Sequence, residues 1–407
     1  MGMRRSALAP AAASLAVLLS LGACAPAQIE EPRTAAIVMP ALEGRFQDVA
    51  DVLEERLAAD GFEVEVHGTD GDIPAQVTVV DELLGEGVDA LVVWPIDGTS
   101  LTPVVEDAPA GTLVVAIGGL VYDTGRLDAF VGFDAASSAE VQLRVLAEAL
   151  PADALPADAP LTIELFVGSP DDAATASHHR ALLAGLESQL DAGTVVVGSG
   201  ETALTDVTTL RGNAETAASR MARILREDYA EGAFPDAVVT TSDEIARGVS
   251  QALLDAGAVP GEGFPVVTGR GAELRSLVAM LEGRQHSTQV EDPRALAEAA
   301  ARLVLTGPAP GAAEATVDNG AAPIAAVLVR GVPVLAADID ELVIGTGYWS
   351  RARLDQAIAE YGTGDAADAG DSGGGGSGGG DAGSGGSGSA GSGSAGSGTA
   401  GSETAGS

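Results

Sequence analysis

Two adjacent pairs and one serine are the residues whose types could do catalytic or metal chemistry. Asp171 and Asp172 follow an apolar run and could act as paired carboxylates in glycoside hydrolysis, although helix capping also accounts for them. His178 and His179 are neighbours in a predicted helix, so their side chains point about 100° apart and do not share a metal ion. Ser372 lies in Gly-Asp-Ser-Gly-Gly, a serine-protease nucleophile motif, but its glycine-rich surroundings offer no ordered scaffold. We therefore expect no catalytic residue, no metal site and no cofactor.

The single cysteine, Cys24, points to a different chemistry. Two arginines, an apolar run over residues 7–21 and two small residues precede it, which is the pattern of a signal peptide. The run is shorter than the roughly 20 residues of a membrane-spanning helix. Residues 21–24 resemble the bacterial lipobox, in which the cysteine is diacylated and becomes the first residue. The alternative is ordinary signal cleavage that leaves a free thiol. We expect an exported protein, lipid-anchored to the cell membrane and facing outside the cytoplasm.

Composition narrows the classes of function. The 407 residues carry a formal charge of −38, and all 21 basic residues are arginines. A chain without lysine has neither a lysine-containing phosphate-binding loop nor Schiff-base chemistry. Strong negative charge argues against nucleic acid as a partner. A 46% hydrophobic share over this length indicates a sizeable core, arranged in two lobes.

Short β-branched runs alternate with amphipathic Ala/Leu-rich stretches from residue 34 onward, which predicts a doubly wound parallel sheet. The first round predicts strands near Ile37, Val64, 91–93, 114–117 and 130–132, with helices over 47–60 and 76–85. The second round predicts strands over 161–166, 195–197, 237–239 and 266–267. The fold class is therefore α/β, with two Rossmann-like lobes that each offer a ligand site at the carboxyl ends of their strands.

Boundaries follow from shifts in composition along the chain. After residue 361 the sequence consists largely of Gly, Ser, Ala, Thr and Asp, which cannot bury apolar surface. We expect a signal peptide (1–23), a tether (24–33), an N-terminal lobe (34–135 with 270–308), a C-terminal lobe (136–269 with 320–361) and a tail (362–407).

Several stretches together resemble a known family. They are residues 72–76, 88–100, 163–172, 209–213, 268–273, 285–288 and 291–292. They are similar to the multiple-monosaccharide and xylose-binding proteins of bacterial ABC sugar importers, which have the type I periplasmic binding protein fold. The resemblance implies two lobes joined by a three-strand hinge that close on a carbohydrate, with ABC permease subunits as partners.

A sugar presents hydroxyl groups around its rim and C–H groups on its faces, so its site needs carboxylates, amides or arginines and an aromatic ring. The resemblance places such ligand-binding residues at Arg45, Phe46, Asp134, Arg211, Asp243 and Arg270. Each has a plainer interpretation. Arg45 and Phe46 could be a surface arginine and a core phenylalanine, the aspartates could cap helices, and Arg211 could be a solvated loop charge.

Departures from the family pattern concern the same site. Residues 117–119 are Ile-Gly-Gly where these sugar binders usually carry Tyr-Asp-Arg. The two charged side chains that hydrogen-bond sugar hydroxyl groups are therefore missing. Arg270-Gly271 replaces Gln-Asp, Glu291 replaces a lysine, and Ala173-Ala174 replaces an asparagine pair. Arg270 and Arg45 together favour an acidic or phosphorylated sugar as one hypothesis. The first expectation is a solute-binding protein for an ABC transporter, and the alternatives are a non-transporting receptor or scaffold and a glycosidase.

Overall fold

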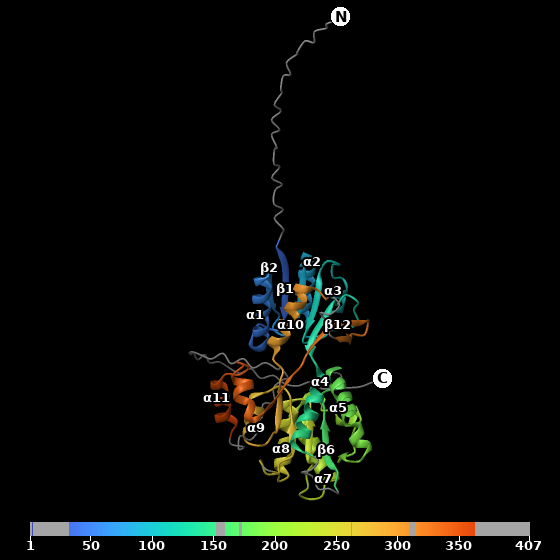
Figure 1. The fold of residues 1–407 in the computed structure, drawn as a ribbon, viewed down its shortest axis with the longest axis vertical. Helices are drawn as coiled ribbons and strands as arrows, with labels where there is room; N and C mark the ends of the chain where they lie inside the picture. The colour runs from blue at the N-terminus through green and yellow to red at the C-terminus, as the bar shows by residue number, and fades with distance from the viewer. Residues whose placement is uncertain are drawn as a thin grey trace, which may run out of the picture.

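A computed structural model describes Gly2 and residues 32–151, 159–170, 173–261, 263–308 and 315–362. These residues form two α/β lobes, one above the other in Figure 1, and each lobe is built on its own sheet. The expected signal peptide with Cys24, the Asp171–Asp172 pair and the tail with Ser372 lie outside the described residues. Within the described ranges, no helix is long and apolar enough to cross a membrane.

The sheet of the N-terminal lobe has the strand order β11-β12-β5-β4-β3-β1-β2, and every neighbouring pair is parallel except β11 with β12. Its strands are β1 (Arg33–Met39), β2 (Phe62–Gly68), β3 (Ala90–Val93), β4 (Leu113–Ile117), β5 (Ala129–Phe133), β11 (Ala315–Asp318) and β12 (Pro323–Val329). In β1, Ile37 and Met39 face one hydrophobic core, whereas Ala36 and Val38 face another. Burial on both faces explains why the strand is apolar throughout.

Helices cover both faces of this sheet. One face carries α1 (Gly44–Ala59) and α10 (Pro293–Thr306), and the other carries α2 (Ile73–Glu86) and α3 (Thr102–Glu106). Helix α1 buries Val49, Leu53 and Leu57, which recur every four residues along one side. Helix α2 begins at Asp72, whose side chain accepts a hydrogen bond from the Ala75 N–H at 2.9 Å.

The sheet of the C-terminal lobe has the order β13-β10-β9-β8-β6-β7. Its strands are β6 (Leu161–Phe166), β7 (Val195–Val197), β8 (Ala237–Thr240), β9 (Val266–Thr268), β10 (Ser287–Val290) and β13 (Val332–Leu335). The two faces are covered by α4 (Ala135–Ala149) with α5 (Ala173–Asp191), and by α7 (Ala214–Asp228) with α8 (Asp243–Asp255). Short helices α6 (Leu204–Val207) and η1 (Leu210–Gly212) follow β7.

A further cluster forms beside β13 in the same lobe. It contains α9 (Leu274–Leu281), the short turns η2 (Ala336–Asp338) and η3 (Ile339–Ile344), and α11 (Arg351–Tyr361). Leu277, Val343 and Leu354 are buried together in its core. The last described helix therefore packs on the C-terminal lobe, as Figure 1 shows for α11 and α9.

Three segments of the described chain pass between the lobes: β5 to α4, β10 to α10, and β12 to β13. This confirms the expected class, two doubly wound lobes with a three-strand hinge. In two segments the strand pairing assigns residues to the other lobe than the one expected from the sequence. β10 belongs to the C-terminal sheet because it pairs with β9 and β13, and α9 packs on the same lobe, whereas β12 belongs to the N-terminal sheet because it pairs with β5.

Candidate functional site

The carboxyl ends of the parallel strands in the two sheets face each other. The chain leaves β5 and β12 for the C-terminal lobe and leaves β10 for the N-terminal lobe, always from a strand's carboxyl end. In open α/β sheets ligands bind beyond these ends. The candidate site therefore lies between the residues that follow β1, β3 and β4 on one lobe and those that follow β8, β9 and β10 on the other.

On the N-terminal lobe two rings and a glycine form what we call the aromatic edge: Phe46, Trp94 and Gly118. The rings of Phe46 and Trp94 meet edge to face, with centroids 5.1 Å apart and an interplanar angle of 85°. Gly118 adopts a φ of +71°, and a Cβ at this position would lie 2.2 Å from two atoms of the Trp94 indole. The indole thus occupies the space that a side chain at position 118 needs.

Gln76 holds the backbone of this edge in place. Its Nε2 donates to the Trp94 carbonyl and its Oε1 accepts from the Ile96 N–H, both at 2.9 Å. The Gln76 side chain is 1% exposed, so both ends of the amide are engaged in a buried site. Arg45 completes the edge, with its guanidinium carbon 5.2 Å from the centroid of the Phe46 ring.

On the C-terminal lobe three charged residues form what we call the polar edge: Asp243, Arg270 and Glu291. Arg270 Nε donates to the Thr241 carbonyl at 3.0 Å, and its Nη1 lies 3.5 Å from Glu291 Oε1. The side chains of this ion pair are only 20% and 14% exposed. The two departures from the family pattern are therefore partners, and their pairing offsets the charge that would favour an anionic ligand.

Asp243 lies at the first position of α8 and is 0% exposed. Its carboxylate accepts hydrogen bonds from the Glu273 N–H at 2.8 Å, from Gln285 Nε2 at 3.0 Å and from Thr288 Oγ1 at 2.8 and 2.9 Å. Burial raises the pKa of Asp243 to about 6, and the nearby charge of Glu273 acts in the same direction. In this conformation Asp243 ties three segments of the lobe together.

A buried histidine of α5 contacts α4 where the chain enters the C-terminal lobe. His178 Nδ1 lies 3.1 Å from the Ala135 carbonyl, and its Nε2 lies 2.9 Å from Gln142 Oε1. Burial lowers the pKa of His178 to about 3, with the charge of Arg270 as the next cause. His179 instead contacts the Thr202 carbonyl at 2.8 Å. The two histidines thus serve different segments. Among the described residues, no group of three or more His, Cys, Asp or Glu side chains could hold a metal.

The remaining candidates lie close to helix starts. Asp134 is half-buried in the first crossing segment, and its carboxylate accepts from the Ser137 N–H at 2.9 Å as the N-cap of α4. Arg211 is exposed in η1 with a φ of 59°. The structure brings Arg45 and Phe46 together on one lobe, and Asp134, Asp243 and Arg270 near the hinge of the other. Ligand contact by all six residues stays a prediction.

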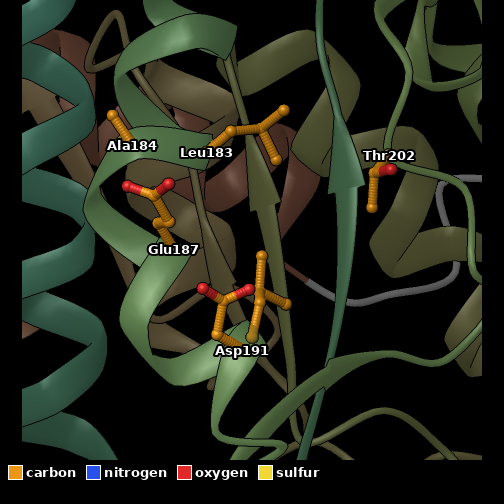
Figure 2. Close-up of a pocket in the computed structure, with 6 residues that line it drawn as sticks. Leu183, Ala184, Glu187, Asp191 and Thr202 are labelled. Carbon is orange, nitrogen blue, oxygen red and sulfur yellow. The ribbon is translucent and has the colours of Figure 1, made fainter.

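A separate hollow of about 410 Å³ lies on the C-terminal lobe, along the second half of α5. Figure 2 shows Ala184, Glu187 and Asp191 along one helix and Thr202 on a neighbouring segment. Leucines and carboxylates line it, so it offers no aromatic ring to a sugar face. The facing edges are therefore the better candidate site.

Comparison with known proteins decides the family. The family described as a periplasmic binding protein domain matches residues 35–307. The chain belongs to the periplasmic binding protein family. Among curated relatives of this periplasmic binding protein, the multiple sugar-binding periplasmic receptor of Rhizobium radiobacter is 30% identical over 351 residues, covering 84% of this chain and 98% of the receptor. The D-xylose-binding periplasmic protein of Escherichia coli is 26% identical, covering 76% and 88%.

A solved structure agrees with these relatives. An ABC transporter solute-binding protein from Clostridium phytofermentans, with bound β-D-glucose, superposes with a TM-score of 0.65 at 28% identity and covers 79% of this periplasmic binding protein and 100% of its own chain. The names of these proteins describe binding proteins and not enzymes. The expected family, a type I sugar-binding protein of the kind found in ABC importers, is confirmed.

Sequence reasoning did not identify Trp94 of the aromatic edge, or Gln76 that holds its backbone, as site residues. Trp94 directly follows β3, and it is one of only two tryptophans in the chain. Gln76 ends one of the stretches that carry the family resemblance, and its contact with Trp94 joins that stretch to another. A rare aromatic residue just after a predicted strand was the available signal.

Proposed function

We propose that this periplasmic binding protein captures a monosaccharide or a related polar sugar derivative outside the cytoplasm and delivers it to an ABC transporter. The observation that carries the proposal is the pair of facing edges, one with two aromatic rings and one with carboxylates and an arginine. Aromatic rings suit the C–H face of a sugar, and charged groups suit its hydroxyl rim. The sugar-binding relatives support the same ligand class.

The mechanism is closure of the two lobes around the ligand. A sugar that touches both edges at once binds the closed state more tightly than the open state and so shifts the population toward closure. The crossing segments form the hinge, and two of them are tied together by the Asp134 N–H, which donates to the Val329 carbonyl at 2.8 Å. Hinges of this kind absorb backbone rotation while the lobes move as rigid bodies.

A thermal-shift panel of neutral monosaccharides, sugar acids, polyols and amino acids tests the binding proposal on the mature chain. A ligand present at 100 times its Kd stabilises the folded state by about 2.7 kcal/mol, so a true ligand stands out from the panel. We expect neutral sugars to shift Tm more than uronic acids, because Glu291 already partners Arg270. Stabilisation by amino acids alone would contradict a sugar receptor.

Lipid anchoring is a second part of the proposal and rests on Cys24 and the apolar segment before it. Two acyl chains give stable membrane attachment, whereas one gives only marginal binding. Cells expressing the chain are expected to incorporate labelled palmitate into it and to retain it in the membrane fraction. Cys24→Ser should abolish both. Equal membrane retention of the variant would rule out this anchor.

The second candidate function is a receptor or scaffold that no longer serves transport. This candidate is favoured by the glycines at positions 118 and 119, which stand where the family pattern has two charged, sugar-binding residues. Small-angle scattering separates the two candidates: a capture protein contracts when a sugar is added, whereas a scaffold keeps its radius with every member of the panel.

A further inference from the structure

The end of strand β4 offers no polar side chain to a ligand. Ile117 is 0% exposed, positions 118 and 119 are glycines, and Leu120 is 9% exposed. The backbone donors here are also engaged: the Gly118 N–H donates to the Val131 carbonyl at 2.8 Å and the Gly119 N–H to the Ile117 carbonyl at 2.7 Å. A ligand atom placed against this strand end therefore meets carbon atoms, N–H groups that already have acceptors, and the backbone carbonyls of the two glycines, but no polar side chain.

The neighbouring strand end adds to this apolar surface. The Trp94 indole lies over Gly118, with two ring atoms 2.2 Å from the position of a Cβ there, and the Phe46 ring meets it edge to face. The nearest buried amide, that of Gln76, is used at both ends to hold residues 94 and 96. Apart from Arg45, the hydrogen-bonding side chains of the candidate site lie on the polar edge and in the hinge.

We infer that the site selects a neutral sugar that presents a deoxygenated edge to the aromatic edge, and that Gly118 and Trp94 determine this specificity. The inference rests on the proposed sugar-binding function and deepens it. A hydroxyl group pointed at Gly118 loses its hydrogen bonds to water and finds no polar side chain to replace them, so it is satisfied at most by a backbone carbonyl and weakens binding. A C–H or methyl group in the same place gains contact with the indole ring and loses nothing.

Calorimetry with matched sugar pairs tests the inference on the mature full-length chain. Suitable pairs are D-fucose with D-galactose, L-rhamnose with L-mannose, and 2-deoxy-D-glucose with D-glucose. For the pair that fits the site, we expect the deoxy member to bind at least tenfold more tightly than its hydroxylated parent, which corresponds to about 1.4 kcal/mol.

A pair of variants checks that Gly118 and Trp94 carry the preference. Trp94→Ala makes room beside position 118 and should weaken binding of the deoxy member. Adding Gly118→Asn to Trp94→Ala places an amide there, and asparagine tolerates the left-handed φ of this position. The double variant should favour the hydroxylated parent relative to the single variant. Unfolding curves of both variants verify that each is folded.

The outcomes separate this inference from the function on which it rests. The proposed specificity is wrong if, in every pair, the parent sugar binds the unaltered chain as tightly as its deoxy partner. The sugar-binding function stands in that case. An unchanged preference in the double variant overturns the role of Gly118. Failure of every sugar to bind overturns the proposed function and the inference with it.

Discussion

The aromatic edge and the polar edge follow strands of two sheets with the same architecture, yet their chemistry is opposite. On the aromatic edge, rings and glycine form the surface, and the backbone beneath them is fixed by the Gln76 amide. On the polar edge, Arg270 and Glu291 pair with each other while Asp243 is buried under four hydrogen bonds. The N-terminal edge thus presents two rings beside Arg45, whereas the charged groups of the C-terminal edge are already partnered within the lobe.

Burial of the Asp243 carboxyl on the polar edge should make the free energy of unfolding depend on pH. The folded pKa of Asp243 is raised to about 6 from an ordinary value near 4, so folding favours the protonated carboxyl. The stability that this proton provides is fully present below pH 4 and is lost as pH rises through about 6, an effect of roughly 3 kcal/mol. Asp243→Asn should remove this loss from urea unfolding curves measured between pH 4 and pH 7.

The control for this measurement is Ser242→Ala, which removes the side chain that caps α8 at the neighbouring position. This substitution should lower the free energy of unfolding by about 1 kcal/mol at every pH, because it removes a hydrogen bond and no titrating group. Identical pH slopes in Asp243→Asn and the unaltered chain would show that the carboxylate is held ionised by its three donors, the Glu273 N–H, Gln285 and Thr288.

The aromatic edge should be sensitive to the amide beneath it. Gln76→Leu leaves the Trp94 carbonyl and the Ile96 N–H without their partner in a buried place, which should cost about 2 kcal/mol of folding free energy. Sugar affinity should fall as well, because the indole is no longer fixed. Urea unfolding and calorimetry measure the two effects. Gln251→Leu, which removes an exposed amide on α8, should change stability by less than about 0.5 kcal/mol.

The smallest effect concerns the ion pair of the polar edge. A double-mutant cycle with Arg270→Gln and Glu291→Gln should give a coupling free energy of about 1 kcal/mol, since the pair is partly buried and its atoms are 3.5 Å apart. The coupling should shrink in high salt. Strict additivity of the two substitutions would mean that the charges act independently and that Arg270 is available to an anionic ligand.

The fold was largely predictable from the sequence because its signals are local. Apolar runs such as 91–93 and 114–117 are strands buried on both faces, and each strand that was predicted with a first residue begins within one residue of the observed strand. Lobe membership was less predictable at β10 and β12, since a strand's own residues do not record which sheet it joins. That depends on pairing with residues far away in the sequence.

The site was predictable in part, for a related reason. The family resemblance predicts Arg45 and Phe46 at the site, and the structure places them at the start of α1, after β1, while their contact with a ligand stays a prediction. The ion pair between Arg270 and Glu291 was not expected, although both residues were noted as departures, because their proximity depends on how β9 and β10 align. The burial of Asp243 depends likewise on Gln285 and Thr288, which lie just before β10 and within it.

Three crossings between the lobes also govern the order of folding. The N-terminal sheet gains β12 only when residues 323–329 have been made, although its partner β5 ends at Phe133. Neither lobe is a continuous piece of chain, so truncation at any point before the end of β13 leaves at least one sheet short of a strand. Long-range pairing of this kind slows folding, because the intervening loop must close before the contact forms. The N-terminal lobe is begun first and is completed nearly last.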